Sequence, residues 1–247
     1  MIISQDYRPT PSDFGDFVYC SRKWTMKHNK ATKEKHVDNA LSQGKKNEHK
    51  CIDWVCNKYK ITEKQILFNG TGENNYNCLT SNIELVNMNC QPDLIINVYN
   101  KNILFEFKAV SKPEYLDLHE FDSVDAQVWC YTKLKEFKID EYRLLRYFID
   151  PFAYFDNPIP RRFTNKAYEE KIIHFFDFVS CRFEEHFKKY IKTIELFKLE
   201  DDIIKRRIIT DPIFTFLQQL PNEKEKKCYY CSEKRKVCDA LNIQSAW

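Results

Sequence analysis

The stretch "QPDLIINVYNKNILFEFKAV", residues 91–110, decides the fold expected for this chain. It contains two apolar runs joined by a short polar segment, which is the pattern of a β-hairpin. Asp93 precedes the first run, and Glu106 and Lys108 interrupt the second run at alternate positions. Successive side chains of a strand point to opposite faces, so Glu106 and Lys108 share one face. The stretch therefore predicts two strands with acidic and basic groups gathered on one side.

The length of the turn decides whether Asp93 joins that face. With a two-residue turn at Asn100 and Lys101, Asp93 lies opposite Lys108, and Glu106 lies on the diagonal. A three-residue turn would send Asp93 to the other face of the sheet. The prediction of a shared site thus depends on an even number of turn residues or on a bulge.

Two carboxylates and one ammonium group on one face indicate a site for a divalent cation. Like charges close together resist ionisation, so the arrangement is costly unless a cation compensates it. Mg²⁺ and Mn²⁺ prefer carboxylate, carbonyl and water oxygens, and a nearby lysine can orient or deprotonate water that attacks a phosphate. The alternative is an amphipathic hairpin with a solvated charged face. The residue pattern alone leaves both interpretations open.

The composition narrows the class of protein. A chain of 247 residues can bury a sizeable core without disulfide bonds, and no segment offers a signal peptide or a membrane span. We expect a protein of a reducing prokaryotic cytosol, encoded by the cell or by a virus, in which clustered cysteines hold metal. The net charge of +3 does not identify a nucleic-acid binder. None of the four glycines forms a phosphate-binding loop, which argues against NTPase and dinucleotide-binding folds.

The rest of the pattern predicts an α/β core. Thr10 is a favourable N-cap for a helix that starts at Pro11 and carries Cys20. A second helix, at 37–59, has an apolar stripe that contains one carboxylate, Glu48. Strands are expected at 64–68, 82–88, 93–99, 103–109 and 142–150, a helix at 124–137, and a long amphipathic helix at 166–197.

The hairpin resembles the signature of PD-(D/E)xK nucleases, in which Asp93, Glu106 and Lys108 match the PD and ExK residues. One helix later, Gln127 and Tyr131 resemble the QxxxY motif of the RecB-like branch of these enzymes. Four residues apart on a helix, these two side chains share a face. The resemblance implies a restriction-endonuclease-like fold, an α/β core in which helices flank a mixed sheet.

The resemblance also implies a metal ligand upstream of the hairpin. RecB-like nucleases carry a glycine on the preceding helix and, four residues later, usually a histidine that binds metal. Here Gly44 is followed at that position by Glu48, with His49 one residue further. We favour Glu48, which also lies on the apolar stripe, and keep His49 as the alternative; a structural role for Glu48 stays open. The implied ligands of Mn²⁺ or Mg²⁺ are Glu48 or His49, Asp93, Glu106 and the main-chain carbonyl of Phe107.

Four cysteines resemble the cluster ligands of part of this branch. In the CRISPR-associated Cas-four exonuclease family, one early and three late cysteines bind a [4Fe–4S] cluster, as Cys20, Cys228, Cys231 and Cys238 would here. Ser21 replaces the usual proline after the early cysteine, and the last spacing is one residue longer than is common. Tetrahedral Zn²⁺ on the same thiolates is the rival assignment. The remaining cysteines are expected in the core: Cys51, Cys56, Cys78, Cys90, Cys130 and Cys181.

The resemblance implies a metal-dependent DNA exonuclease that hydrolyses phosphodiester bonds of single strands from an end. By resemblance its catalytic residues are Asp93, Glu106, Lys108, Gln127 and Tyr131, with Lys108 positioning and activating the water. Two roles are expected: CRISPR spacer acquisition beside the adaptation integrase, or replication or recombination of a virus or mobile element. The alternative from another class is a zinc-stapled DNA-binding module without nuclease activity.

The domain organisation expected is a single nuclease domain over 1–247. Its PD-(D/E)xK core spans 36–150, and a helical extension spans 160–222. The two chain ends, 1–30 and 223–247, are expected to form the cluster-binding lobe together.

Overall fold

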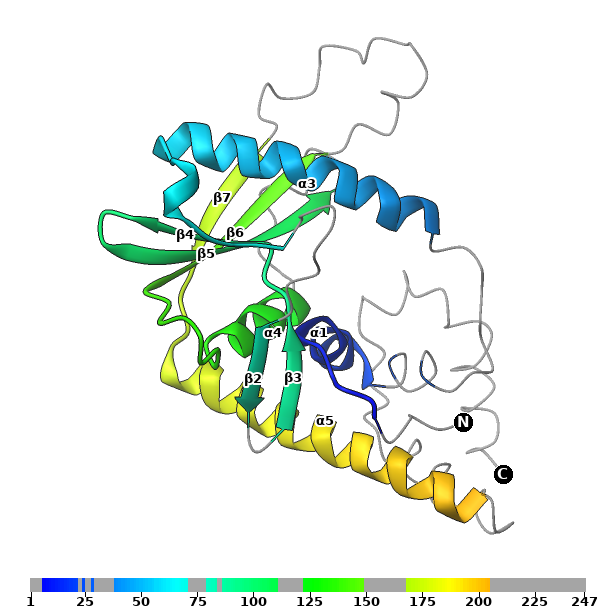
Figure 1. Ribbon diagram of the computed structural model, residues 1–247. Coiled ribbons are helices and arrows are strands. Elements are labelled where there is room, and N and C mark those ends of the chain that lie inside the picture. Colours follow the sequence, from blue (N-terminus) through cyan, green and yellow to red (C-terminus); the bar gives the residue numbers. More distant parts are fainter. Residues whose placement is uncertain are drawn as a thin grey trace.

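The computed structural model describes residues 6–21, 24, 28, 38–70, 79–83, 86–110, 122–148 and 168–204. Within them a five-stranded sheet has the strand order β1-β4-β5-β6-β7. Helix α3 covers one face of this sheet, and helices α1 and α4 lie on the other side with the long helix α5 beyond them (Figure 1). A separate two-stranded sheet, β2-β3, stands beside α4 and α5 (Figure 1). This is the α/β architecture expected from the sequence.

Most of the elements lie close to where the residue pattern places them. Thr10 is the N-cap of α1, because its side chain accepts a hydrogen bond from the main chain of Asp13 at 3.1 Å. No helix in the described ranges is long and apolar enough to cross a membrane. In chain order the elements are α1 (Pro11–Tyr19), α3 (Asp38–Tyr59), η2 (Glu63–Gln65), β1 (Ile66–Asn69), β2 (Leu79–Ile83), β3 (Val86–Cys90), β4 (Leu94–Val98), β5 (Lys101–Val110), α4 (Asp122–Tyr131), β6 (Glu141–Phe148), β7 (Tyr168–Ile173) and α5 (Asp177–Ile204).

The hairpin β4-β5 forms with a different turn from the one expected. The turn residues are Tyr99 and Asn100, both in the left-handed region (φ 51° and 60°), and Val98 pairs with Lys101. Two left-handed residues are the pattern of a type I′ turn, whose twist matches that of the strands. The turn lies one residue earlier than predicted, which shifts the register by two residues. Because a shift of two keeps every side chain on its face, Asp93 now lies opposite Glu106 rather than Lys108.

Strand β6 pairs with β5 in parallel, so the sheet is mixed. A parallel pair needs a crossover connection, and α4 supplies it between the two strands. Helix α1 then packs closely on α4 at Gly15, where an added Cβ would lie 2.4 Å from the main-chain oxygen of Ser123. The glycine therefore allows α1 to hold α4 against the sheet.

Three expected elements differ in the structure. The strand expected at 82–88 is a hairpin, β2-β3, in which Ile83 pairs with Val86; without glycine or proline, the sequence gives no turn signal there. The helix expected at 124–137 ends at Tyr131, where turn hydrogen bonds take over. The prediction of a helix over 166–197 is wrong for its first part. Residues 168–173 form strand β7, and α5 starts only at Asp177. The apolar positions within 168–173 are too few to distinguish a helix from a strand, and pairing with β6 makes this segment a strand.

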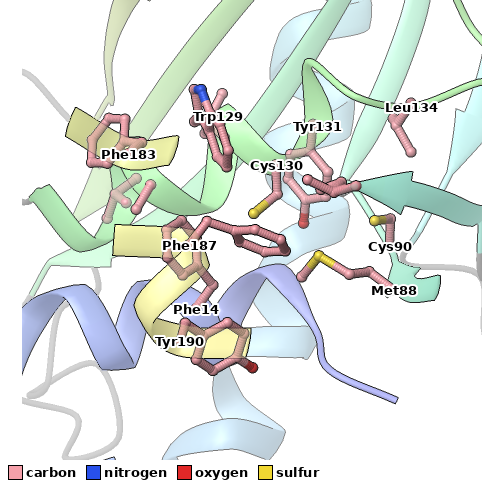
Figure 2. Packing of buried hydrophobic residues seen from close by; sticks show 14 of the residues in the cluster. Phe14, Met88, Cys90, Trp129, Cys130, Tyr131, Leu134, Phe183, Phe187 and Tyr190 are labelled. Atoms are coloured by element: carbon pink, nitrogen blue, oxygen red, sulfur yellow. The ribbon is translucent and has the colours of Figure 1, made fainter. Parts of the chain in front are cut away.

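The core lies in two clusters, one on each face of the sheet. On the α3 side, Phe105 and Phe107 of β5 pack with Val55 of α3. On the other side, aromatic residues of α1, α4 and α5 interlock with β3 and β5 (Figure 2). Of the cysteines expected in the core, Cys51, Cys90 and Cys130 are buried, Cys56 is half-buried and Cys181 is exposed, so the expectation is wrong for Cys181; Cys78 lies outside the described residues.

Phe187 on α5 offers a test of this packing. Its ring is fully buried against Phe14 and Trp129, with centroid distances of 5.2 and 5.9 Å. We expect Phe187→Ala to lower the free energy of unfolding by about 3–5 kcal/mol through lost contacts and a cavity. The matched control is Phe178→Ala on the same helix, where the ring is 73% exposed and the change should stay within about 0.5 kcal/mol. Urea unfolding measures both, and equal losses would contradict the described packing.

Candidate active site

Five of the side chains singled out in the sequence meet at one end of the hairpin. Asp93 directly precedes β4, while Glu106 and Lys108 lie on β5. Phe105 and Phe107, which alternate with them, point to the α3 side, so Glu106 and Lys108 face α4. From α4, Gln127 reaches the same place, and Tyr131 follows one turn later on the same helix. The structure thus brings the two motifs together across the sheet–helix interface.

Gln127 links the acid and the base of this site. Oε1 of Glu106 accepts hydrogen bonds from Nζ of Lys108 at 2.6 Å and from Nε2 of Gln127 at 2.7 Å. The amide oxygen of Gln127 in turn accepts from Nζ of Lys108 at 3.1 Å. One amide therefore donates to the carboxylate and accepts from the ammonium group, which fixes both side chains in one orientation.

The carboxylate of Asp93 is held by the main chain of β5. Its Oδ2 accepts a hydrogen bond from the N–H of Phe107 at 2.5 Å. Burial, followed by the negative charge of Glu106, raises the pKa of Asp93 well above its usual range, although Lys108 and the Phe107 N–H act in the opposite direction. For Lys108, burial would lower the pKa, but Glu106 and Asp93 together raise it. Lys108 and the Phe107 N–H thus only partly offset the effect of burial and of Glu106 on the pKa of Asp93.

Tyr131 is a buried residue of α4 that contacts both Gln91 and Gln127. It is 2% exposed, and its hydroxyl donates to the main-chain oxygen of Gln91 at 3.1 Å. Nε2 of Gln127 lies 3.4 Å from the same hydroxyl oxygen. Burial, then the charges of Glu106 and Asp93, raises the pKa of Tyr131 well above its usual range. The phenol stays protonated and joins α4 to the segment that leads into Asp93.

The donor set fits a hard divalent cation. Glu106 is 2% exposed, and its Oε2 has no hydrogen-bond partner among the described residues, although burying such an oxygen unpaired is costly. Mg²⁺ is commonly held by one or two carboxylates, with water and substrate phosphate completing its shell. Asp93 and Glu106 supply two carboxylates, and no cluster of three or more His, Cys, Asp and Glu suited to a metal occurs in the described ranges. The residues present therefore suit Mg²⁺ or Mn²⁺ with an open coordination shell.

The two candidates for an additional ligand lie on α3 and differ in burial. Glu48 is partly buried, and its charge contributes to the raised pKa of Asp93. His49 is exposed. Between the two, the environment favours Glu48, and its role as a ligand stays a prediction, as does that of the Phe107 carbonyl.

Of the four cysteines expected to bind a cluster, Cys20 is among the described residues. Cys20 directly follows α1 and is partly buried. Cys228, Cys231 and Cys238 lie outside the described residues. The cluster-binding lobe and the other domain boundaries therefore stay predictions.

Arg146 on β6 was not singled out from the sequence. It pairs with Lys108 in the parallel register of β5 and β6, which puts the two side chains on one face, and it is 3% exposed. Its position in the apolar strand run "YRLLRYF" was the available signal, because a buried strand rarely carries an arginine without a partner or a function. A buried guanidinium of β6 thus lies next to Lys108 on the same face of the sheet.

The same fold occurs in solved exonucleases. Two crystal structures of the alkaline exonuclease LHK-Exo from Laribacter hongkongensis, one of them in complex with dAMP, match with TM-scores of 0.52 and 0.51 and 13% identity, over 81% of this chain and 92% of theirs. A phage-related exonuclease from Haemophilus somnus 129PT matches with a TM-score of 0.50 and 12% identity, over 82% and 97%. No protein-family profile and no curated protein matches the sequence. The chain thus has a mixed α/β, restriction-endonuclease-like fold, which these exonucleases share.

Proposed function

We propose that this protein is a divalent-metal-dependent nuclease that hydrolyses phosphodiester bonds of DNA. One observation carries the proposal: the buried Glu106 offers an unpaired carboxylate oxygen beside Asp93, while Lys108 lies within hydrogen-bonding distance of the same carboxylate. A purely structural charged face would be solvated and would not bury Glu106. The exonuclease names of the structural neighbours support the same class of reaction.

Each residue of the site then has a distinct task. Asp93 and Glu106 would hold the cation, with Glu48 and the Phe107 carbonyl as further ligands, and the bound cation would supply Lewis-acid chemistry at the scissile phosphate and a water molecule of lowered pKa. Lys108 orients that water and offsets negative charge that develops on the phosphate. Gln127 holds the side chains of Glu106 and Lys108 in a fixed orientation relative to each other.

We further propose that the enzyme is an exonuclease that prefers single strands. For the biological role, the phage-related exonuclease among the structural neighbours favours replication or recombination of a virus or mobile element. Trimming of DNA for CRISPR spacer acquisition beside the adaptation integrase is the second role. The genes next to the reading frame distinguish the two roles.

The experiment that tests the substrate uses three DNA forms with Mg²⁺: a labelled linear single strand, the same sequence as a linear duplex, and a closed circular single strand. An exonuclease degrades the linear strands and spares the circle, and a single-strand preference appears as a faster rate on the first form. Cutting of the circle would make the protein an endonuclease. Tight binding to all three forms without any cutting would favour the DNA-binding module.

We also propose that Cys20, Cys228, Cys231 and Cys238 bind a [4Fe–4S] cluster that joins the two chain ends. Protein purified without oxygen should be brown and contain iron and inorganic sulfide, because four thiolates are the usual ligands of such a cluster. Cys20→Ser should lose the colour and lower the midpoint of thermal unfolding. The control Cys181→Ser, at an exposed cysteine of α5, should keep both. A colourless protein with stoichiometric zinc would instead assign the four thiolates to Zn²⁺.

A further inference from the structure

The main chain around Asp93 is held by contacts outside the sheet ladder. The β1-β4 pairing ends at Asn69 and Leu94, so Asp93 itself lies beyond the ladder. Past that end, the N–H of Gly70 donates to the main-chain oxygen of Asp93 at 2.9 Å. Nε2 of Gln91 donates to the main-chain oxygen of Gly70, also at 2.9 Å. The segment 91–93 is therefore tied to Gly70 from both of its ends.

A second tie comes from α4. The hydroxyl of Tyr131 donates to the main-chain oxygen of Gln91 at 3.1 Å. Gln91 thus receives a hydrogen bond on its main chain and gives one from its side chain. Through this residue, the helix that carries Gln127 is coupled to the segment that carries Asp93.

Position 70 also has no room for a side chain. A Cβ at this position would lie 2.4 Å from the oxygen of Pro92 and 3.4 Å from Cα of Asp93. The contacted atoms belong to the main chain, so they cannot swing aside as a flexible side chain would. No described glycine has a positive φ, so what requires glycine here is the close approach and not an unusual backbone angle.

We infer that Gly70 and Gln91 are positioning residues that hold the main chain at Pro92 and so aim the Asp93 carboxylate at the Phe107 N–H and at Glu106. The inference rests on the proposed nuclease function for its catalytic consequence. Metal-binding and catalytic groups lose efficiency when they are displaced by about 1 Å. A Cβ at residue 70 forces a shift of this order, since side-chain carbons do not approach an oxygen as closely as 2.4 Å.

The variants Gln91→Met and Gly70→Ala test the inference on the full-length protein. Methionine keeps the length of Gln91 and removes the donor to Gly70. The matched control is Gln65→Met, because Nε2 of Gln65 donates to the main-chain oxygen of Asn97 at 3.2 Å near the other end of β4. The control removes the same kind of bond to the main chain, from η2 to the far end of β4 and away from Asp93, together with the two hydrogen bonds that Oε1 of Gln65 accepts from Thr62.

The first measurement is the amide proton resonance of Phe107 in the metal-free protein, observed by NMR. A short hydrogen bond from this amide to a carboxylate moves the resonance downfield. We expect the resonance to move upfield in Gln91→Met and Gly70→Ala and to stay in place in Gln65→Met. A merely structural role of Gln91 and Gly70 would leave it unchanged in all three.

The second measurement is steady-state cleavage of DNA, which gives kcat and KM. We expect kcat to fall about tenfold in Gln91→Met and about 100-fold in Gly70→Ala, with KM for DNA unchanged and more Mg²⁺ needed for half-maximal rate. The inference is overturned if both variants match Gln65→Met in the Phe107 resonance and in kcat. If the wild-type protein cuts no DNA, the proposed function fails, and the Phe107 resonance alone then decides whether Gly70 and Gln91 position Asp93.

Discussion

Asp93→Asn should abolish Mg²⁺-dependent cleavage of DNA and leave the metal-free fold at least as stable as the wild type. The amide can still accept the hydrogen bond from the Phe107 N–H, so local geometry is kept. It cannot supply the negative charge of the carboxylate ligand. We expect the cleavage rate to fall by about a thousandfold or more, because a bound divalent cation contributes several kcal/mol to stabilising the transition state.

The stability of the same variant follows from the sign of the pKa shift. Burial and the charge of Glu106 raise the pKa of Asp93 in the folded state, so its ionised form is less favourable there than in the unfolded chain. Stability from this group is present at low pH and is lost as the pH rises through the folded pKa. At pH values above that range, asparagine removes the cost, and the midpoint of urea unfolding should stay equal or rise.

The control for this variant is Asp53→Asn, an exposed carboxylate on α3. It should change neither the rate nor the midpoint of unfolding. If Asp93→Asn cuts DNA at the wild-type rate, the assigned site is wrong. If Asp93→Asn is inactive but unfolds at a much lower urea concentration than Asp53→Asn, Asp93 is needed for the fold. The predicted stability of the variant, derived from the raised pKa of Asp93, is then wrong.

Lys108→Met should separate catalysis from metal binding. The methionine keeps the apolar part of the side chain and removes the ammonium group that donates to Glu106 and Gln127. The charge developing on the phosphate then lacks its partner, and we expect the rate to fall about 100-fold or more. Metal binding should persist or tighten, because a positive charge next to the two carboxylates is gone.

Mn²⁺ binding followed by electron paramagnetic resonance, together with the single-turnover rate, measures both effects of Lys108→Met. Lys101→Met is the matched control, at the exposed first residue of the same strand. Loss of Mn²⁺ binding in Lys108→Met would show that the lysine shapes the site rather than serves the reaction. A wild-type rate would remove Lys108 from the mechanism.

The faces of the hairpin could be predicted from the sequence, but its register could not. Alternation along "ILFEFKAV" separates Glu106 and Lys108 from the phenylalanines whatever the pairing. The register depends on the turn, and neither Tyr99 nor Asn100 is a glycine that would have marked the left-handed positions. Because the error was two residues, the prediction that Asp93 shares the face of Glu106 and Lys108 survived.

The contacts around Asp93 show what a sequence pattern leaves out. In the sequence, Gly70 merely follows the strand expected at 64–68, yet its close approach to Pro92 depends on a chain segment more than twenty residues away. Strand β7 was mispredicted for the same reason. Its pairing with the distant strand β6, and not its own residue spacing, makes it a strand. Patterns within one element were therefore predictable, whereas contacts between distant segments required the fold.

The most direct measurement of the central claim is the metal dependence of DNA cleavage by the wild-type protein. The protein is treated with a chelator, separated from it, and then given labelled linear single-stranded DNA with no metal, with Mg²⁺ or with Mn²⁺. The site at Asp93 and Glu106 predicts no cleavage without metal and full cleavage once either cation is restored. Equal cleavage in the presence of chelator, or none with either cation, would contradict the assignment of a metal-dependent nuclease.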